Sequence, residues 1–333
     1  MIRFAATRAS SLLRPTRLNS RSYNAATDVW NFKQHEPPMT KIVCTIGPST
    51  DTVGPIQELV NNGMNVARLN FSHAGTDYSY PEACMALVRN AHGRHAELSA
   101  GATLPNIPSN LRAILVDTKG PEIRTGPLQG GAEVVELATG CVVEVTTEDV
   151  SSDPKPETAD GPHRLNVDYQ SIATTLNVGS QVLLDDGLIA LQVSHVENNS
   201  VTCVALNGGP IKKNKGVNLP DSELDLPALT EKDKRDLKWS VEVGADFVAA
   251  SFIRTAANVR SVKAFLDRCV ADCPQIEGTH HTRLRPHVIS KIESKEGVDH
   301  FDEILAESDG IMVARGDLGV EIPFRKVFAA QKM

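Results

Sequence analysis

The chain has 333 residues, a formal net charge of −7 and 41% apolar residues, a composition that excludes general disorder and is ordinary for a protein with a packed core. The acidic balance argues against a broad nucleic-acid-binding face, and no apolar run approaches the roughly 20 residues of a membrane-spanning helix. We therefore expect no nucleic-acid partner and no membrane partner. The six cysteines include no C-x-x-C pair, which is typical of reduced thiols in an intracellular protein.

Residues 1–27 differ in composition from the rest of the chain. They contain five arginines, no lysine and no acidic residue, and they are rich in Ser and Ala. This composition is typical of an organellar presequence, so we expect a mitochondrial protein whose folded part begins near Thr40. The alternative is a disordered basic tail on a cytoplasmic enzyme.

From Lys41 onward, short β-branched runs alternate with stretches of helical spacing. The runs are KIVCTI, MNVARLNF, LRAILVD, ADFVAASFI, HVISKI and DGIMVA, and the helical stretches lie at about 53–62, 78–98, 230–243, 255–271, 295–306 and 323–332. This alternation predicts parallel strands joined by helical crossovers. An open sheet and a closed barrel satisfy the pattern equally.

Residues 121–221 interrupt the alternation. They contain VVELATGCVVEVTT, SQVLLDDGLIALQVSHV and SVTCVALN, which are separated by Gly, Asn and Pro clusters and include no convincing helical stretch. The pattern predicts an antiparallel β domain inserted between a strand and the following helix, with SSDPKPETADGPH as an exposed loop.

Polar residues follow the apolar runs, at the end where parallel α/β folds assemble their active sites. Among them, Arg68, Lys119, Arg124 and Lys291 suit phosphate oxygens, while Glu293 and Asp317 suit a hard cation such as Mg²⁺. Further oxygen donors suit a second, less demanding cation: Asn70, Ser72, Asp117 and Thr118. These residue types favour phosphoryl transfer, which depends mainly on positioning and charge neutralisation. The sequence contains no Walker motif, so a nucleotide must be held in another way.

The tripeptide Arg315-Gly316-Asp317 is compatible with an adhesion motif, a tight turn or a carboxylate held out for a metal. Its place directly after an apolar strand, with Glu293 expected on the neighbouring strand, favours the metal-binding carboxylate. Glycine at position 316 suits a close approach of the backbone to a substrate.

Eight motifs in order resemble those of pyruvate kinase: KIVCTIGPST, NVARLNFSH, VDTKGPEIRTG, DDGLI, KGVNLP, ASFIR, SKIE and IMVARGDLGVEIP. The resemblance covers about residues 40–333. It implies an α/β fold of the (β/α)8 TIM-barrel type, truncated after about six strands, with an inserted all-β lid domain and no C-terminal domain. The expected boundaries are a basic extension at 1–27, an incomplete barrel at 40–120 and 222–333, and the lid at 121–221.

The resemblance also implies roles for particular residues. Lys291 and Arg68 would be catalytic, and the substrate site would comprise Arg68, Lys291, Gly316 and Asp317. Mg²⁺, or Mn²⁺, would be bound by Glu293 and Asp317, and K⁺ by Asn70, Ser72, Asp117 and Thr118. ADP or ATP would contact Asn70, His73, Arg124 and Lys215. The implied reaction transfers a phosphoryl group from phosphoenolpyruvate to ADP, giving pyruvate and ATP in the final step of glycolysis, and the family assembles as homotetramers.

The sequence departs from the family pattern beside these positions. The family usually has Gly, Gly and Asn where this chain has Ala74, Asp221 and Ser294, and EIPFRKV places Phe324 and Arg325 where EIPAEKV is usual. Two other functions remain open. One is a truncated, non-catalytic relative that binds metal and phosphate or a full-length homologue. The other is an aldolase-like metal barrel, which would need neither the inserted domain nor Lys215.

Overall fold

The structure is a computed structural model that describes residues 2–4, 40–72, 74–93, 112–273 and 284–333. The chain divides into two compact units. Unit 1 contains residues 1–5, 70–74 and 116–333, and unit 2 contains residues 6–69 and 75–115. Most of the predicted presequence and the predicted nucleotide ligand His73 lie outside the described residues.

Unit 2 contains a pair of parallel strands with two helices. Strand β2 (Ile42–Ile46) pairs in parallel with β3 (Met64–Asn70), and the helices are α1 (Val53–Asn61) and α2 (Ser79–Asn90). Helix α1 buries Ile56 and Val60, which lie four residues apart and therefore on one face. Strand β4 (Ala113–Asp117) starts in unit 2 and ends in unit 1.

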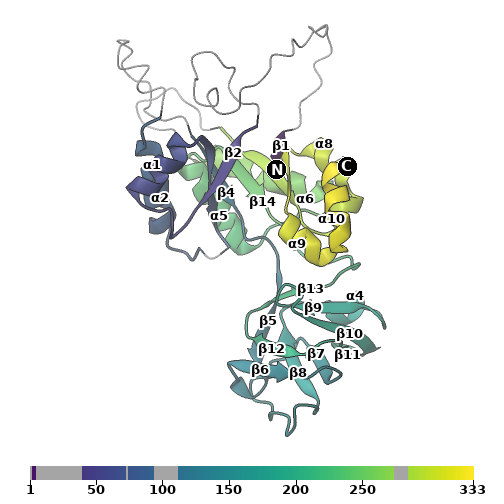
Figure 1. Cartoon of the computed structure of the whole chain (residues 1–333). Helices are drawn as coiled ribbons and strands as arrows, with labels where there is room; N and C mark the ends of the chain where they lie inside the picture. The colour runs from purple at the N-terminus through teal and green to yellow at the C-terminus, as the bar shows by residue number, and fades with distance from the viewer. Residues whose placement is uncertain (1, 5–39, 73, 94–111, 274–283) are drawn as a thin grey trace, which may run out of the picture. The chain divides into compact units, whose positions relative to one another are not determined.

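Unit 1 contains the remaining parallel strands and most of the helices (Figure 1). Strand β15 (His287–Ile292) lies between β14 (Phe247–Ala250) and β16 (Gly310–Val313), and it pairs in parallel with both. The helices are α5 (Glu231–Glu242), α6 (Ala256–Asp272), α7 (Lys295–Asp299), α8 (Phe301–Glu307), α9 (Arg315–Glu321) and α10 (Phe324–Lys332). Apolar residues of α5, α6 and α8 pack with those of the strands in one core.

A short strand from the N-terminal end of the chain pairs with β16. Strand β1 (Ile2–Phe4) runs antiparallel to it, with Ile2 opposite Met312 and Phe4 opposite Gly310. These three residues fall within the range that the composition assigned to a presequence-like extension.

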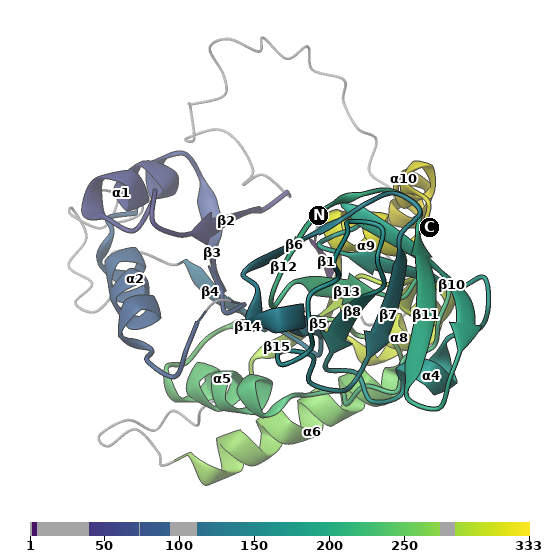
Figure 2. The same cartoon turned by 90° about the horizontal axis from the view of Figure 1, so that it is seen from below.

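The inserted segment forms a closed barrel of seven strands (Figure 2). Its strand order is β10-β11-β7-β8-β5-β13-β9, and β6 (Val134–Leu137) pairs with β12 (Gly209–Lys212) in a separate ribbon. The barrel strands are β5 (Ile123–Leu128), β7 (Val142–Thr146), β8 (His163–Val167), β9 (Gln181–Leu184), β10 (Ile189–Val196), β11 (Ser200–Ala205) and β13 (Gly216–Asn218). Alternate residues of β8 are buried, because successive side chains of a strand point to opposite faces. The predicted α/β fold with an inserted all-β domain is therefore confirmed.

Four details differ from the sequence prediction. The helix expected at 295–306 is two helices separated at His300, whose ring nitrogen Nδ1 lies 3.1 Å from the carbonyl oxygen of Arg254. The residues directly after β16, for which no helix was predicted, form helix α9, and the inserted segment contains one short helix, α4 (Ile172–Thr175), and a 3-10 turn, η1 (Gln129–Gly131). No helix within the described part of the chain is both long and apolar enough to span a membrane. All six cysteines are free thiols.

Candidate active site

The predicted catalytic lysine lies in a buried cluster of four polar side chains from three strand ends. The ammonium Nζ of Lys291 lies 2.9 Å from Oε1 of Glu293, 3.1 Å from Oδ1 of Asp117 and 2.8 Å from Oγ of Ser251. Lys291 is 8% exposed, and the other three residues are 3% exposed or less. An ammonium has three N–H groups, so the three oxygens match its full donor capacity.

Burial and neighbouring charges shift the pKa values of Lys291 and Glu293 in this cluster. Burial lowers the pKa of Lys291, but the charges of Glu293 and Asp117 more than offset it, and the net pKa lies above its usual value. The pKa of Glu293 is raised to about 7, chiefly by burial; the charge of Asp317 also raises it, whereas the charge of Lys291 lowers it. Lys291 is therefore a cation at neutral pH in a site where water screens charge poorly.

The hydroxyl of Ser251 and the backbone N–H of Phe252 hold the two charged side chains Lys291 and Glu293. The N–H of Phe252 donates to Oε2 of Glu293 at 2.5 Å, and Ser251 accepts a hydrogen bond from Lys291. Phe252 has a φ of +54°, a left-handed conformation that is uncommon for a bulky residue. Such strain persists only where the surroundings impose it, and it is concentrated at functional sites.

The four oxygen donors predicted for K⁺ all belong to unit 1 and lie along two strand ends. The N–H of Phe71, between Asn70 and Ser72, donates to the carbonyl oxygen of Asp117 at 2.9 Å, and the N–H of Ser72 donates to Oδ1 of Asn70 at 3.0 Å. Thr118 continues from Asp117, and its N–H donates to the carbonyl oxygen of Ala249. The donor set consists of oxygens only, which is the chemistry that a hard cation requires.

Asp233, at the start of α5, supports this loop, a role that was not predicted. Its Oδ1 accepts a hydrogen bond from the N–H of Gly120 at 2.9 Å, and its Oδ2 accepts from the N–H and the hydroxyl of Thr230. The Thr230-x-x-Asp233 capping box was visible in the sequence, but nothing there indicated the contact with Gly120. The buried ring of Trp239, also on α5, lies 5.2 Å from the ring of Phe71.

Asp317 lies in the first turn of α9 rather than in a loop. It is exposed, and its charge raises the pKa of Glu293, so the two predicted Mg²⁺ ligands are electrostatic neighbours. A divalent cation would relieve the repulsion between them, and carboxylate oxygens are suitable ligands, so the pair fits Mg²⁺ or Mn²⁺. Within the described ranges, no group of three or more His, Cys, Asp or Glu side chains is placed to hold a metal ion. A Cβ at Gly316 would meet no atom within 4 Å, so protein packing does not require this glycine.

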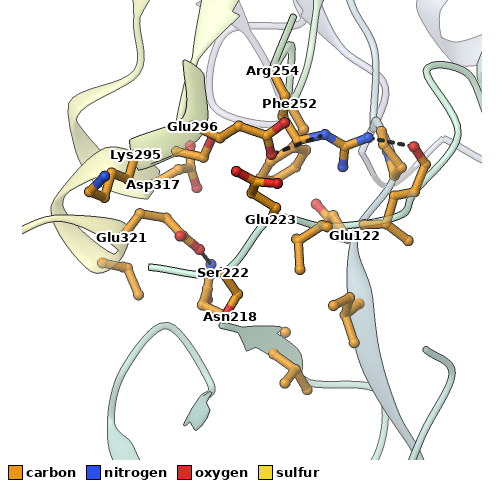
Figure 3. Close-up of a pocket in the computed structure, with 18 of the residues that line it drawn as sticks. Glu122, Asn218, Ser222, Glu223, Phe252, Arg254, Lys295, Glu296, Asp317 and Glu321 are labelled. Atoms are coloured by element: carbon orange, nitrogen blue, oxygen red, sulfur yellow. Dashed lines mark hydrogen bonds and ion pairs between the residues drawn. The ribbon is translucent and has the colours of Figure 1, made fainter. Parts of the chain in front are cut away.

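A pocket of about 420 Å³ lies beside Asp317 in unit 1 and is lined by residues of the inserted barrel and of the β14 to α9 region (Figure 3). It contains more acidic than basic groups. The acids are Glu122, Asp185, Asp186, Asp221, Glu223, Glu296, Asp299, Asp317 and Glu321, and the bases are Arg124, Lys215, Arg254 and Lys295. An excess of carboxylates disfavours a bare phosphate, so a nucleotide would require an accompanying cation.

Two predicted nucleotide contacts line this pocket. Nε of Arg124 donates to Oε2 of Glu122 at 2.9 Å, and Nζ of Lys215 donates to Oδ1 of Asp185 at 2.9 Å. Arg124 and Lys215 are therefore each paired with a carboxylate that lines the pocket, and a phosphate would have to compete with that carboxylate.

Asp221, one of the departures from the family pattern, also lines the pocket. Its φ is +58°, a left-handed conformation that glycine adopts freely and that Asp tolerates better than most residues. Glu321 accepts a hydrogen bond from Asn218 at 2.7 Å (Figure 3). Burial raises the pKa of Glu321, and the charges of Asp221 and Asp317 raise it further. Where the family usually has Gly, Asp221 therefore adds a negative charge close enough to raise the pKa of Glu321.

Arg68 belongs to unit 2, where its Nη1 donates to Oγ1 of Thr45 at 2.7 Å. Lys291 belongs to unit 1, and the expectation that Arg68 and Lys291 contact the same substrate phosphate stays a prediction.

The chain resembles known proteins over most of its length. The sequence model described as "Pyruvate kinase, barrel domain" matches residues 38–333. Pyruvate kinase PKLR of Homo sapiens is 46% identical over 295 residues, which cover 88% of this chain and 47% of that protein. The pyruvate kinase of Geobacillus stearothermophilus is 41% identical over 296 residues (88% and 44%), and that of Leishmania mexicana is 40% identical over 294 residues (88% and 52%). The chain spans about half the length of these relatives. The family match and these identities show that the chain belongs to the pyruvate kinase family.

Proposed function

We propose that this chain transfers a phosphoryl group from phosphoenolpyruvate to ADP, giving pyruvate and ATP. The observation that carries the proposal is the buried Lys291 cluster, in which a lysine cation is held by Glu293, Asp117 and Ser251 at the ends of parallel strands. Family membership supports the same reaction. The substrates, the cations and the catalytic activity of this chain are parts of the proposal.

Lys291 has the central role in the proposed reaction. The bond between the phosphorus and the enol oxygen breaks, a bond from an ADP oxygen to the phosphorus forms, and the released enolate takes up a proton at carbon to become pyruvate. The ammonium of Lys291 neutralises the negative charge that passes between the two oxygens, and its burial increases the strength of that interaction. The hydrogen bonds to three fixed oxygens orient the ammonium before substrate binds.

Two groups of residues would hold cations in this proposal. Glu293 and Asp317 would bind Mg²⁺ or Mn²⁺, and Asn70, Ser72, Asp117 and Thr118 would bind K⁺. When bound, the divalent cation supplies charge neutralisation for the phosphoryl group. Arg68 would contact the phosphate, and Arg124 and Lys215 line a pocket of about 420 Å³ that would receive the nucleotide.

The experiment is an assay of pyruvate formation by the full chain, with phosphoenolpyruvate, ADP, Mg²⁺ and K⁺ present. We expect Lys291→Met to lower the rate by a factor on the order of 10³, because it removes a buried cation from the reacting group. Lys238→Met is a matched control, since Lys238 is an exposed lysine of α5 that lies outside the cluster and the pocket. An equal loss in both variants, or pyruvate formation that does not need ADP, would refute the proposed reaction. Metal binding without pyruvate formation would instead support the non-catalytic alternative.

A further inference from the structure

Ser251 contacts the ammonium of Lys291 and one of the two groups of residues that the proposed function assigns to cations, the group that contains Asp117 and Thr118. Its Oγ lies 2.8 Å from Nζ of Lys291, beside Glu293, and 2.6 Å from the carbonyl oxygen of Thr118, in the loop that continues from Asp117. Its N–H donates to Oγ1 of Thr118 at 3.1 Å. Ser251 is 3% exposed, so water does not compete for these bonds.

The number of donor hydrogens on Lys291 and Ser251 determines which group donates in each hydrogen bond of Ser251. Lys291 has only donors, so Oγ of Ser251 must accept from it. The one hydroxyl proton of Ser251 then goes to the nearer remaining acceptor, the carbonyl oxygen of Thr118 at 2.6 Å, rather than to Oδ1 of Asp117 at 3.4 Å. The chain of bonds therefore runs from the ammonium through the serine hydroxyl to the Thr118 carbonyl, and each bond polarises the next.

Because of these hydrogen bonds, Ser251 responds both to changes at the Thr118 carbonyl and to changes at the Lys291 ammonium. A cation that draws on the oxygens of Asp117 or Thr118 changes the acceptor strength of the Thr118 carbonyl and hence the direction of the serine hydroxyl. A phosphoryl oxygen that accepts a hydrogen bond from the Lys291 ammonium must displace one of its three acceptors, and Ser251 is the one that is a hydroxyl rather than a carboxyl group. Cation binding at Asp117 and Thr118 and phosphoryl binding at Lys291 therefore both alter the hydrogen bonds of Ser251.

We propose that Ser251 is a positioning residue that couples monovalent-cation binding at Asn70, Ser72, Asp117 and Thr118 to the orientation of the Lys291 ammonium. The coupling works in both directions, because a cation that favours one arrangement of Ser251 must itself be favoured by it. The inference rests on the proposed function, since it names phosphoenolpyruvate as the anion that Lys291 receives.

The test measures phosphoenolpyruvate binding by calorimetry on the full chain with Mn²⁺ and without ADP. Each protein is titrated once in K⁺ and once in tetramethylammonium at equal ionic strength. For the unaltered chain we expect K⁺ to tighten binding on the order of tenfold, which is an ordinary coupling between two sites. In Ser251→Ala the factor should fall below about twofold, while the protein still binds phosphoenolpyruvate and Mn²⁺.

Two further variants separate coupling from general structural damage. Ser290→Ala removes another fully buried hydroxyl, whose partner is Ser308, from the residue before Lys291, and it should keep the K⁺ effect. Ser251→Thr retains the hydroxyl and should restore most of the K⁺ effect that Ser251→Ala loses. The fluorescence of buried Trp239, next to Phe71, gives a second record of K⁺ binding in chains in which Trp30 is replaced by Phe.

The outcomes distinguish failure of the inference from failure of the proposed function. An unchanged K⁺ effect in Ser251→Ala, or an equal loss in Ser290→Ala, overturns the role of Ser251 and leaves the proposed function standing. Phosphoenolpyruvate binding that never depends on K⁺ also overturns the coupling. If the unaltered chain does not bind phosphoenolpyruvate under either condition, the proposed function fails and the inference fails with it.

Discussion

Gly120 lies in the loop that continues from Thr118, against Ser251 of the Lys291 cluster, and its replacement by Ala tests that packing. Its φ is +75°, and an added Cβ would lie 2.7 Å from Cβ of Ser251, 2.9 Å from Cδ2 of Phe252 and 3.1 Å from the carbonyl oxygen of Ser251. The left-handed backbone costs an alanine about 1–2 kcal/mol, and overpacking of a buried site costs about 1–3 kcal/mol more. We therefore expect Gly120→Ala to lower the free energy of unfolding by about 2–5 kcal/mol.

Gly244 is the matched control for this substitution. Its φ is +68°, but an added Cβ would meet no atom within 4 Å, so Gly244→Ala should show only the backbone cost of about 1–2 kcal/mol. The assay is urea unfolding of the full chain, together with Mn²⁺ binding, because Ser251 and Phe252 orient Lys291 and Glu293. Weaker Mn²⁺ binding is expected only in Gly120→Ala. A loss of stability in Gly120→Ala no larger than in Gly244→Ala would refute the described packing.

Three further predictions concern stability and processing. Burial alone would raise the pKa of Asp309, but the N–H of Val288 and the ammonium of Lys263 hold it below its usual value. Asp309→Asn should therefore destabilise the chain at pH 7, and the difference should vanish in urea unfolding as pH falls through the lowered pKa, because the carboxyl is then neutral in both states. A pH-independent difference would contradict this reasoning. Asp233→Ala should cost about 1–2 kcal/mol in the same assay, since α5 loses its cap and Gly120 its acceptor, and no loss would contradict that role. We also propose that residues 1–27 direct mitochondrial import. Mass spectrometry of the native protein should show a shortened N-terminus, and an intact Met1 would contradict cleavage.

The strand pattern could be predicted from the sequence because β-branched apolar runs are a local signal. All six runs from KIVCTI to DGIMVA contain the expected strands, and the inserted β domain was visible from its lack of helical spacing. Helix α9 was missed because Gly316 and Gly319 are poor helix formers, while its stabilising contact is the complete burial of Leu318. That burial is a tertiary effect, which local propensity does not contain.

The sequence pointed to candidate residues for the site but not to the hydrogen bonds that join them. Strand-end position was enough to suggest Lys291, Glu293 and Asp117, since parallel strands bring their carboxyl ends to one edge. The sequence did not indicate that Ser251 would accept from Lys291 or that Asp233 would hold Gly120, because these contacts join residues 40 and 113 positions apart. The residue boundaries of the predicted domains stay predictions.

The most direct test of phosphoryl transfer by this chain is phosphorus NMR of the full chain with phosphoenolpyruvate, ADP, Mg²⁺ and K⁺. We predict that the phosphoenolpyruvate signal falls while the γ-phosphorus signal of ATP rises by the same amount, and that Lys291→Met largely abolishes both changes. A phosphoenolpyruvate signal that stays constant, or that is converted into inorganic phosphate without ATP, would contradict phosphoryl transfer to ADP at the Lys291 cluster.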